Sequence, residues 1–388
     1  MFWAGDAELK AFQSLAADFE QAEGVKVRLQ QVPFAQLLTN VDAGLQSGQA
    51  PDVFRVTYTD LGVYSSRDAL LDLSGSVPGD YASGFSPALY AAVSRDGRPY
   101  GVPHHTDTSM VLVNTEAASA AGLGALPQTY DEAWTWDEFA AALDKLKAAA
   151  KPRTYATGLN LQLAGAYRWL NFVGQAGGRL LDESLRAPAI DSPAGLEPLR
   201  FTQGLYSGGY VPRSTSAKGE YVGDLFTAGT LATVLAGDFL LADIDKGASF
   251  DVSATFLPVK EQATAELGGN ALVATAASGR KEQAAKFLQF AASEEQMAKF
   301  CGATNVLPTR TSIDAADLDY AVRPDLMALY LEQSRAITPE IVQQVTVPEF
   351  NEVNAALVER LEQAFNGGRD AKEVLAGLSA DIEQVLAS

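Results

Sequence analysis

The chain has 388 residues, of which 47% are hydrophobic, and a formal net charge of −19 at pH 7. This length exceeds what one hydrophobic core usually supports, so we expect two domains, and no apolar run is long enough to span a membrane. The acidic balance argues against binding to nucleic acid or to anionic lipid, because both attract clustered Lys and Arg, and we interpret it as a contribution to solubility.

Cysteine and histidine are scarce. Cys301 is the only cysteine, which excludes an internal disulfide and a cysteine zinc site, and its apolar helical surroundings predict a buried, inert thiol. The two histidines, His104 and His105, are adjacent, and adjacent strand residues point to opposite faces of a sheet. We therefore expect no metal site and no cofactor.

Strands and helices alternate in the first part of the chain, which predicts a parallel α/β lobe. Ligands of such sheets collect beyond the carboxyl ends of the strands, which places Asp6 and Thr57–Tyr58 at one rim. The expected elements are a strand at Phe2–Ala4, a helix around Phe12–Phe19 that Gly24 ends, a strand at Val25–Leu29, a helix that Pro33 opens and Gly48 ends, and a strand at Pro51–Val56.

A polar joint follows between two expected strands. Tyr100–Pro103 reads as a short strand closed by its proline, and Met110–Val113 is an apolar run typical of a strand buried on both faces of a parallel sheet. The six polar residues between them, His104–Ser109, are more than a turn needs. We interpret them as the place where the chain leaves one lobe and enters a second; the alternative is an ordinary surface loop.

The remaining residues repeat the pattern of the first lobe. Thr135–Glu138 is a capping box that begins a helix, and Ala232–Ala236 is an expected strand with Gly237–Phe239 directly at its carboxyl end. Two further crossings between the lobes are expected. The predicted division is residues 1–107 and 257–308 in an N-terminal lobe, residues 110–254 and 311–388 in a C-terminal lobe, and hinges near 106–109, 255–258 and 308–310.

No catalytic motif appears in the sequence, and we expect no catalytic residue. Among the 48 acidic residues no spacing singles out the opposed pair that a glycosidase needs. Aromatic residues beside polar ones at expected rims fit a neutral polyhydroxy ligand better, although each aromatic alone is more often part of a core. The aromatic residues are Trp3, Tyr58, Trp169 and Phe239, and their polar neighbours are Asp6, Thr57, Asn171 and Asp238.

Several short motifs, weak one by one, are informative through their order and spacing. With them the chain resembles, over nearly its whole length, the extracellular solute-binding proteins of carbohydrate ABC transporters. The motifs are Phe2–Gly5, Pro51–Phe54, Leu70–Leu73, Tyr100–Pro103, Leu112–Thr115, Thr135–Phe139, Gly229–Phe239, Gly268–Gly269 and Leu307–Arg310.

The resemblance implies a two-lobed periplasmic-binding-protein fold of type II with three hinge crossovers, which closes on a sugar and docks to the permease subunits of the transporter. Phe239 stands where family members commonly carry a sugar-stacking Trp. Arg310 follows the third crossover and either hydrogen-bonds a sugar or pairs with an acid across the hinge. The implied ligand contacts after the first strands, in the first crossover and at the Gly–Gly turn are Trp3 with Asp6, Thr57 with Tyr58, Asp107, and Gly269 with Asn270.

The resemblance also implies a periplasmic or extracellular location, often with a lipid anchor, and we expect a monomer without a nucleic-acid partner. Met1–Ala4 carry no export signal although they begin so close to an expected strand, which suggests that a signal was removed and a start methionine supplied. The leading hypothesis is a non-enzymatic sugar receptor. The alternatives are a carbohydrate-active enzyme with an acidic pair, and a receptor for an anion or metal; an anion site would want more Arg or Lys than Arg55 and Arg310 supply.

Overall fold

The computed structural model describes residues 1–162 and 164–387. The chain forms two compact units, and each is assembled from separate stretches of the sequence. Unit 1 comprises Met1–Asp107, Leu267–Met327 and Thr338–Pro348, and unit 2 comprises Thr108–Glu266, Ala328–Ile337 and Glu349–Ser388.

These bounds differ from the predicted lobes at two of the three expected hinges. The first boundary, between Asp107 and Thr108, falls within the expected 106–109. The second falls after Glu266 and not at 255–258, because the strand that ends at Thr255 pairs inside unit 2. Residues 308–310 belong to unit 1, where Arg310 bridges to Phe85; the chain passes into unit 2 only later, inside helix α13 (Pro324–Ser334).

A three-stranded sheet forms the centre of unit 1. In it β8 (Asn270–Ala274) lies between β1 (Val53–Thr57) and β4 (Gly101–His105), and both ladders are antiparallel. The prediction of a parallel sheet was therefore wrong for these strands. An apolar run such as β8, buried at every residue, indicates that both faces are covered but does not fix the direction of the neighbouring strand.

Pro103 does not end its strand as predicted. β4 continues through the proline to His105, with a register shift between these two residues. A proline is tolerated there because β4 is an edge strand, where a missing N–H breaks no inner ladder. Consequently both histidines belong to the strand, and only Thr106–Thr108 connect it to β5 (Ser109–Asn114).

The expected strands at Phe2–Ala4 and Val25–Leu29 do not form, and Phe2 instead makes one bridge just beyond the second of them. Phe2 forms an isolated parallel bridge with Gln31, in which the Phe2 N–H donates to the Gln30 carbonyl and the Val32 N–H donates to the Phe2 carbonyl. No further ladder bond joins the two segments, so neither is a strand in the described residues.

The helices of unit 1 begin and end largely where the sequence predicted. Gly24 and Gly48 take a left-handed backbone conformation, φ +67° and +71°, and end the first two helices. The first helix packs against α12. The helices are α1 (Asp6–Glu23), α2 (Phe34–Ser47), α3 (Tyr58–Ser65), α4 (Pro87–Ala92), α11 (Lys281–Ala291), α12 (Glu294–Thr304) and α14 (Pro339–Val345), with short 3-10 turns at Tyr81–Gly84 and Ala315–Asp317 and a small hairpin of β2 (Ser94–Arg95) and β3 (Arg98–Pro99).

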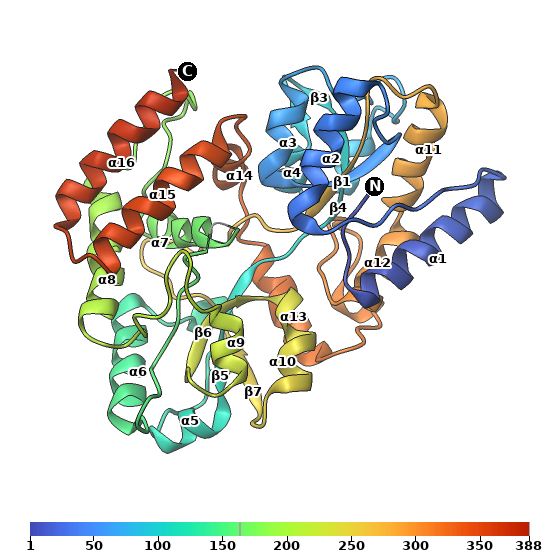
Figure 1. The fold of residues 1–388 in the computed structure, drawn as a ribbon. Helices are drawn as coiled ribbons and strands as arrows, with labels where there is room; N and C mark the ends of the chain where they lie inside the picture. The colour runs from blue at the N-terminus through green and yellow to red at the C-terminus, as the bar shows by residue number, and fades with distance from the viewer. Residues whose placement is uncertain (163, 388) are drawn as a thin grey trace. The chain divides into compact units, whose positions relative to one another are not determined.

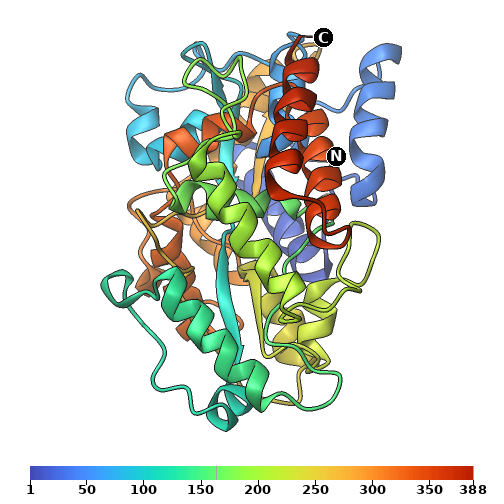
Figure 2. The same cartoon turned by 90° about the vertical axis from the view of Figure 1, so that its left-hand side faces the viewer.

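Unit 2 has its own antiparallel sheet, in which β5 lies between β6 (Thr233–Gly237) and β7 (Val252–Thr255). The long C-terminal helices α15 (Phe350–Phe365) and α16 (Ala371–Leu386) lie side by side in Figures 1 and 2 and cover α8. The other helices are α5 (Thr115–Ala120), α6 (Trp136–Ala149), α7 (Leu170–Gln175), α8 (Pro193–Ser207), α9 (Val222–Thr227) and α10 (Leu241–Gly247), with 3-10 turns at Tyr130–Glu132, Ala166–Trp169 and Asp238–Leu240.

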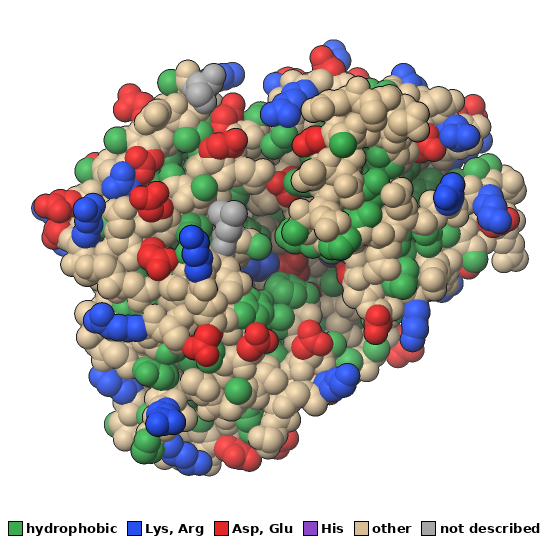
Figure 3. All heavy atoms as spheres, viewed as in Figure 1, with side chains coloured by type: hydrophobic (Ala, Val, Ile, Leu, Met, Phe, Trp, Pro, Cys, Tyr) green, Lys and Arg blue, Asp and Glu red, His purple; other side chains and the backbone are tan. Residues whose placement is uncertain are grey.

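On the face shown in Figure 3, acidic and basic side chains are interspersed and no histidine is visible. Both histidines are buried, as is the thiol of Cys301, which confirms the predicted buried cysteine. A search of helices within residues 1–162 and 164–387 finds none with the length and apolarity that a membrane crossing requires.

His104 is enclosed by aromatic rings in the core of unit 1. Its ring centroid lies 4.3 Å from that of Phe300 and 5.7 Å from that of Phe12. Neither of its ring nitrogens has a hydrogen-bond partner among the described residues, and burial, with the nearby charge of Arg55, lowers the pKa of His104 to about 3. The imidazole is therefore neutral in the folded protein at any pH near neutrality.

This burial predicts a loss of stability in mild acid. An unfolded histidine takes up a proton below a pKa of about 6.5, whereas folded His104 does not, so the unfolded state gains free energy as pH falls. Between pH 7.5 and 5.5 the contribution of His104 is about 1.4 kcal/mol. Denaturant unfolding of His104→Phe at both pH values should show an acid-induced loss smaller by that amount than in the wild type; an equal loss would contradict the assignment.

Candidate functional site

At one edge of the unit 1 sheet, which we call its rim, the carboxyl ends of β1 and β4 meet the amino end of β8. The register places Asn270, the first residue of β8, opposite both Thr57 at the end of β1 and His105 at the end of β4. The Asn270 amide lies 3.1 Å from His105 Nε2. Gly269 precedes them with φ +90°, and a Cβ there would lie 2.5 Å from the His105 carbonyl oxygen, so only glycine fits this turn.

Arg55, two residues before the end of β1, organises this rim. Its side chain is 2% exposed, and its guanidinium donates to the Trp3 carbonyl at 2.7 Å and to the Glu8 carboxylate at 2.6 Å. Nη2 also lies 3.0 Å from His105 Nε2, and the guanidinium stands 4.5 Å from the centroid of the Trp3 ring. The rim thus carries a buried ion pair with an aromatic ring over it.

The other residues predicted for unit 1 lie at different depths. Asp6, at the start of α1, is exposed, and Thr57 is half-buried with its hydroxyl donating to the Asp60 carboxylate. Tyr58 is only 1% exposed; its hydroxyl donates to the His105 carbonyl at 3.0 Å, and burial raises its pKa. Asp107 is buried beside Gly268, where a Cβ would meet its carboxylate.

The contacts of Arg310 are with groups of unit 1. Its Nε donates to the Ala292 carbonyl at 2.5 Å, and its guanidinium lies 4.4 Å from the centroid of Phe85 and 5.8 Å from that of Tyr81. All of these residues belong to unit 1. The physical reason is the bridge between Arg310 and Phe85, which aligns the two backbones and brings the side chain over the rings.

In unit 2 the buried carboxylate of Glu266 is the centre of a polar cluster, which we call the Glu266 cluster: Thr108, Ser109, Arg168, Asn171 and Glu266. Glu266 is 3% exposed and forms an ion pair with Arg168. It also accepts hydrogen bonds from the Ser109 hydroxyl at 2.6 Å and the Asn171 amide at 2.5 Å. The sequence analysis missed both charged residues.

Two predicted residues follow the end of β6, which the register places opposite Ser109. Asp238 is fully buried, and its carboxylate accepts the Thr108 N–H at 3.1 Å. The next side chain, Phe239, is 42% exposed, and the Arg168 guanidinium lies 5.6 Å from its ring centroid. The Glu266 cluster therefore stands directly behind an exposed aromatic ring.

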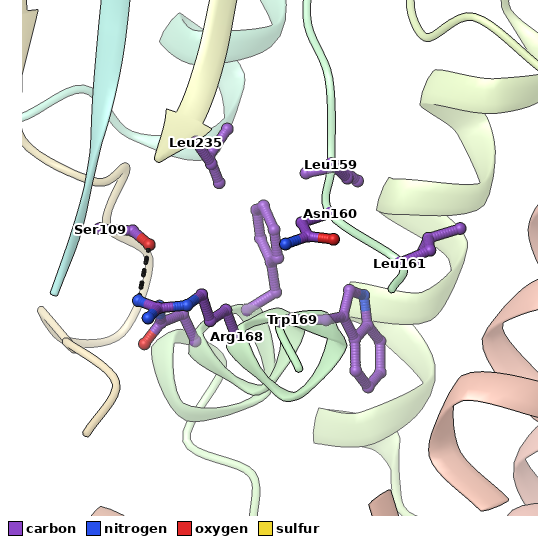
Figure 4. A pocket seen from close by; sticks show the side chains of 10 residues that line it. Ser109, Leu159, Asn160, Leu161, Arg168, Trp169 and Leu235 are labelled. Atoms are coloured by element: carbon purple, nitrogen blue, oxygen red, sulfur yellow. Dashed lines mark hydrogen bonds between the residues drawn. The ribbon is translucent and has the colours of Figure 1, made fainter. Parts of the chain in front are cut away.

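Figure 4 shows how Arg168 and Trp169, neighbours in the chain, point apart. Arg168 points toward Ser109, whose hydroxyl lies 3.3 Å away, whereas Trp169 lies beside Leu161. Trp169 is buried, and its indole N–H donates to the Thr202 hydroxyl at 3.0 Å. A small cavity lies between them, lined mainly by apolar side chains such as Leu159 and Leu235.

The predicted residues thus form a rim in each unit, while several of them pack beneath it. Trp3 lies against Arg55, and Phe239 lies against Arg168 of the Glu266 cluster. Tyr58, Asp107, Trp169, Asn171, Asp238 and Asn270 are buried, and Arg310 contacts a backbone carbonyl and two aromatic rings of unit 1. Over the described residues, no group of three or more His, Cys, Asp or Glu side chains has the arrangement of a metal site.

The two units and their rims define a two-lobed solute-binding protein. Residues 14–328 match the family described as bacterial extracellular solute-binding protein, and the chain belongs to that family. The predicted fold class is thereby confirmed.

Curated relatives align with most of the chain. It is 22% identical over 350 residues to the maltodextrin-binding protein MdxE of Bacillus subtilis, which covers 88% of this chain and 79% of the relative. It is 24% identical over 315 residues to the diacetylchitobiose-binding protein DasA of Streptomyces coelicolor, covering 78% and 70% respectively.

Solved structures agree with the fold over the whole length. The GacH receptor of Streptomyces glaucescens, solved unliganded and with acarbose, has a TM-score of 0.80 at 23% identity, and UgpB of Mycobacterium tuberculosis in complex with glycerophosphocholine has a TM-score of 0.84 at 22% identity. Each comparison covers 100% of this chain and 98% of the other. At this identity the likeness concerns the fold alone.

The ion pair between Glu266 and Arg168 predicts that removing one charge will lower the free energy of unfolding strongly. Glu266→Gln keeps the size of the side chain but leaves Arg168 without its counter-charge, so unfolding free energy should fall by about 3 kcal/mol. Glu197→Gln is the matched control, since Glu197 pairs with Lys260 at the surface of the same unit, and it should cost about 0.5 kcal/mol. Equal losses of unfolding free energy in the two variants would show that the buried pair contributes no more to stability than the surface pair.

Proposed function

We propose that this protein is the substrate-binding component of an ABC importer, which captures a sugar or oligosaccharide and delivers it to permease subunits in the membrane. The observation that carries the proposal is Phe239, an exposed ring beside the strand-end Gly237 and backed by Arg168. Aromatic faces cover the C–H faces of sugar rings. Relatives named for binding maltodextrin and diacetylchitobiose support the same ligand class.

The roles proposed for the residues follow from their depth. On unit 1 Trp3 stacks on the sugar, Asp6 and Thr57 bind hydroxyl groups, and the buried Asn270 supports the rim from behind. On unit 2 Phe239 stacks on the sugar. The buried or glycine positions, which fix the shape of the two rims, are proposed to act from behind them: Tyr58, Asp107, Trp169, Asn171, Asp238 and Gly269.

We further propose that the ligand contacts both units and that the connecting segments act as a hinge. Two segments cross from one unit to the other, and they are hydrogen-bonded to each other on both sides of the boundary. In unit 1 the Thr106 hydroxyl donates to the Gly268 carbonyl at 3.0 Å, and in unit 2 the Ser109 hydroxyl donates to the Glu266 carboxylate. A few residues would then absorb the rotation. The protein is proposed to act as a monomer outside the cytoplasmic membrane, held there by a lipid anchor in its natural form, and without enzymatic activity.

Sugar binding is tested directly by thermal-shift screening against a panel of sugars and oligosaccharides. A sugar present at a hundred times its dissociation constant should add about 2.7 kcal/mol to the unfolding free energy. Phe239→Ala should raise the Kd measured by calorimetry about tenfold, with unfolding unchanged. Oligosaccharides recovered after incubation should be intact; cleaved products would establish the enzyme alternative instead.

Closure is tested by solution scattering. If a sugar contacts both units only when they are closed, it shifts the population toward the closed form by its differential affinity for the two forms. The radius of gyration should therefore be smaller with saturating sugar than without it. Equal radii in a sample that calorimetry shows to be saturated would contradict the hinge and favour a receptor that is closed before it binds.

A further inference from the structure

Phe34 is a second exposed aromatic ring. Phe34 and Phe239 are the large hydrophobic side chains that are exposed among the described residues, at 50% and 42%, and they lie in different units. Phe34 is the first residue of α2, directly after the N-cap Pro33. Because the proline restricts the backbone there, the position of the ring is set by the start of the helix.

The ring of Phe34 is held against Trp3. The two centroids lie 5.0 Å apart, and the planes meet at 72°, an edge-to-face arrangement. The segments that carry them are tied by the bridge between Phe2 and Gln31 and by the Gln31 amide, which donates to the Ala4 carbonyl at 2.9 Å. The pair is therefore preorganised and is not a loose surface contact.

Trp3 in turn rests on the buried Arg55, whose charge is balanced by Glu8. The same order of groups occurs in unit 2, where Phe239 is backed by Arg168 and Arg168 is paired with Glu266. In unit 2 the neutralised arginine lies against the exposed Phe239 itself, whereas in unit 1 it lies against the half-buried Trp3, on which the exposed Phe34 packs. The site proposed around Phe239 thus has a counterpart built from the same groups.

The surroundings of Phe34 fit a small polyhydroxy ligand better than a protein. The chain segments next to the two rings carry exposed polar residues, namely Asp6, Lys10, Gln31 and Gln36. A stable protein interface needs a continuous apolar core over about 800 Å² of each partner, which two rings do not supply. A sugar ring needs one aromatic face and a few hydrogen-bonding groups at its edge, and the exposed Asp6 follows Trp3 by three residues in the chain.

We propose that Phe34 and Trp3 form a carbohydrate-stacking subsite on unit 1, in which Phe34 is a specificity-determining residue. The inference rests on the proposed function, since it names a further contact for the same ligand. It assigns to Phe34 a direct contact with a pyranose ring and to Arg55 the positioning of Trp3.

The test compares a substitution that removes the planar aromatic face of Phe34 with one that keeps it. Phe34→Leu keeps an apolar side chain but removes the planar face, and should weaken binding of the tightest sugar from the panel about tenfold in calorimetry. Phe34→Tyr keeps the face and should bind within about twofold of wild type. Phe290→Leu is the matched control, because Phe290 is a half-buried phenylalanine of unit 1 that packs on Phe19, and it should leave the Kd unchanged.

Each outcome decides a separate point. Wild-type affinity in Phe34→Leu, in a protein that binds sugar, overturns the subsite and leaves the proposed function intact. If Phe34→Leu keeps its sugar affinity but slows uptake through the transporter in cells, the face binds a protein and the subsite is equally overturned. Absence of any sugar binding by the wild type removes the proposed function and the subsite together. Equal loss in Phe34→Leu and Phe290→Leu assigns the effect to folding and also counts against the subsite.

Discussion

The buried carboxylate of Glu266 is the constraint on which the surroundings of Phe239 in unit 2 depend. A charge removed from water is destabilising unless nearby groups compensate it, so each of its partners is held in one place. Those partners are the residues that enter unit 2, Thr108 and Ser109, and two residues of the 166–175 segment, Arg168 and Asn171. Because Arg168 also lies beneath Phe239, the position of the exposed ring follows from a hydrogen-bond network that has little contact with solvent.

In unit 1 a buried ion pair also holds an aromatic ring in place, but the residues come from different elements. Arg55 comes from a strand and Glu8 from the first turn of α1, and their ion pair supports Trp3 through both its carbonyl and its ring. His105 completes the arrangement: burial and the nearby Arg55 lower its pKa, and its Nε2 lies 3.0 Å from Arg55 Nη2 and 3.1 Å from the Asn270 amide. Both rims are therefore rigid where they are buried and present aromatic rings where they are open.

The sequence predicted the ends of elements better than their partners. Gly24, Gly48, the Thr135–Glu138 capping box and the strand before Asp238 follow from local chemistry, and the structure has them. The direction of the strands could not be read from apolar runs, and β8, the central strand of unit 1, pairs with residues more than 160 positions away. Arg168 and Glu266 are separated by 98 residues, so no spacing could reveal their pairing. Phe34 escaped notice because a phenylalanine at a helix start is normally interpreted as a core residue.

The pairing of both arginines also bears on the kind of ligand that the rims suit. An anion would need guanidinium groups whose charge is not already balanced, whereas Arg55 is bound to Glu8 and Arg168 to Glu266. Arg310, the remaining candidate for an anion contact, donates to a backbone carbonyl and lies over two rings. What the rims offer instead is aromatic surface beside carboxylates and amides, which hydrogen-bond to hydroxyl groups without requiring a charge on the ligand. These ion pairs are consistent with the neutral sugar that we propose as the ligand.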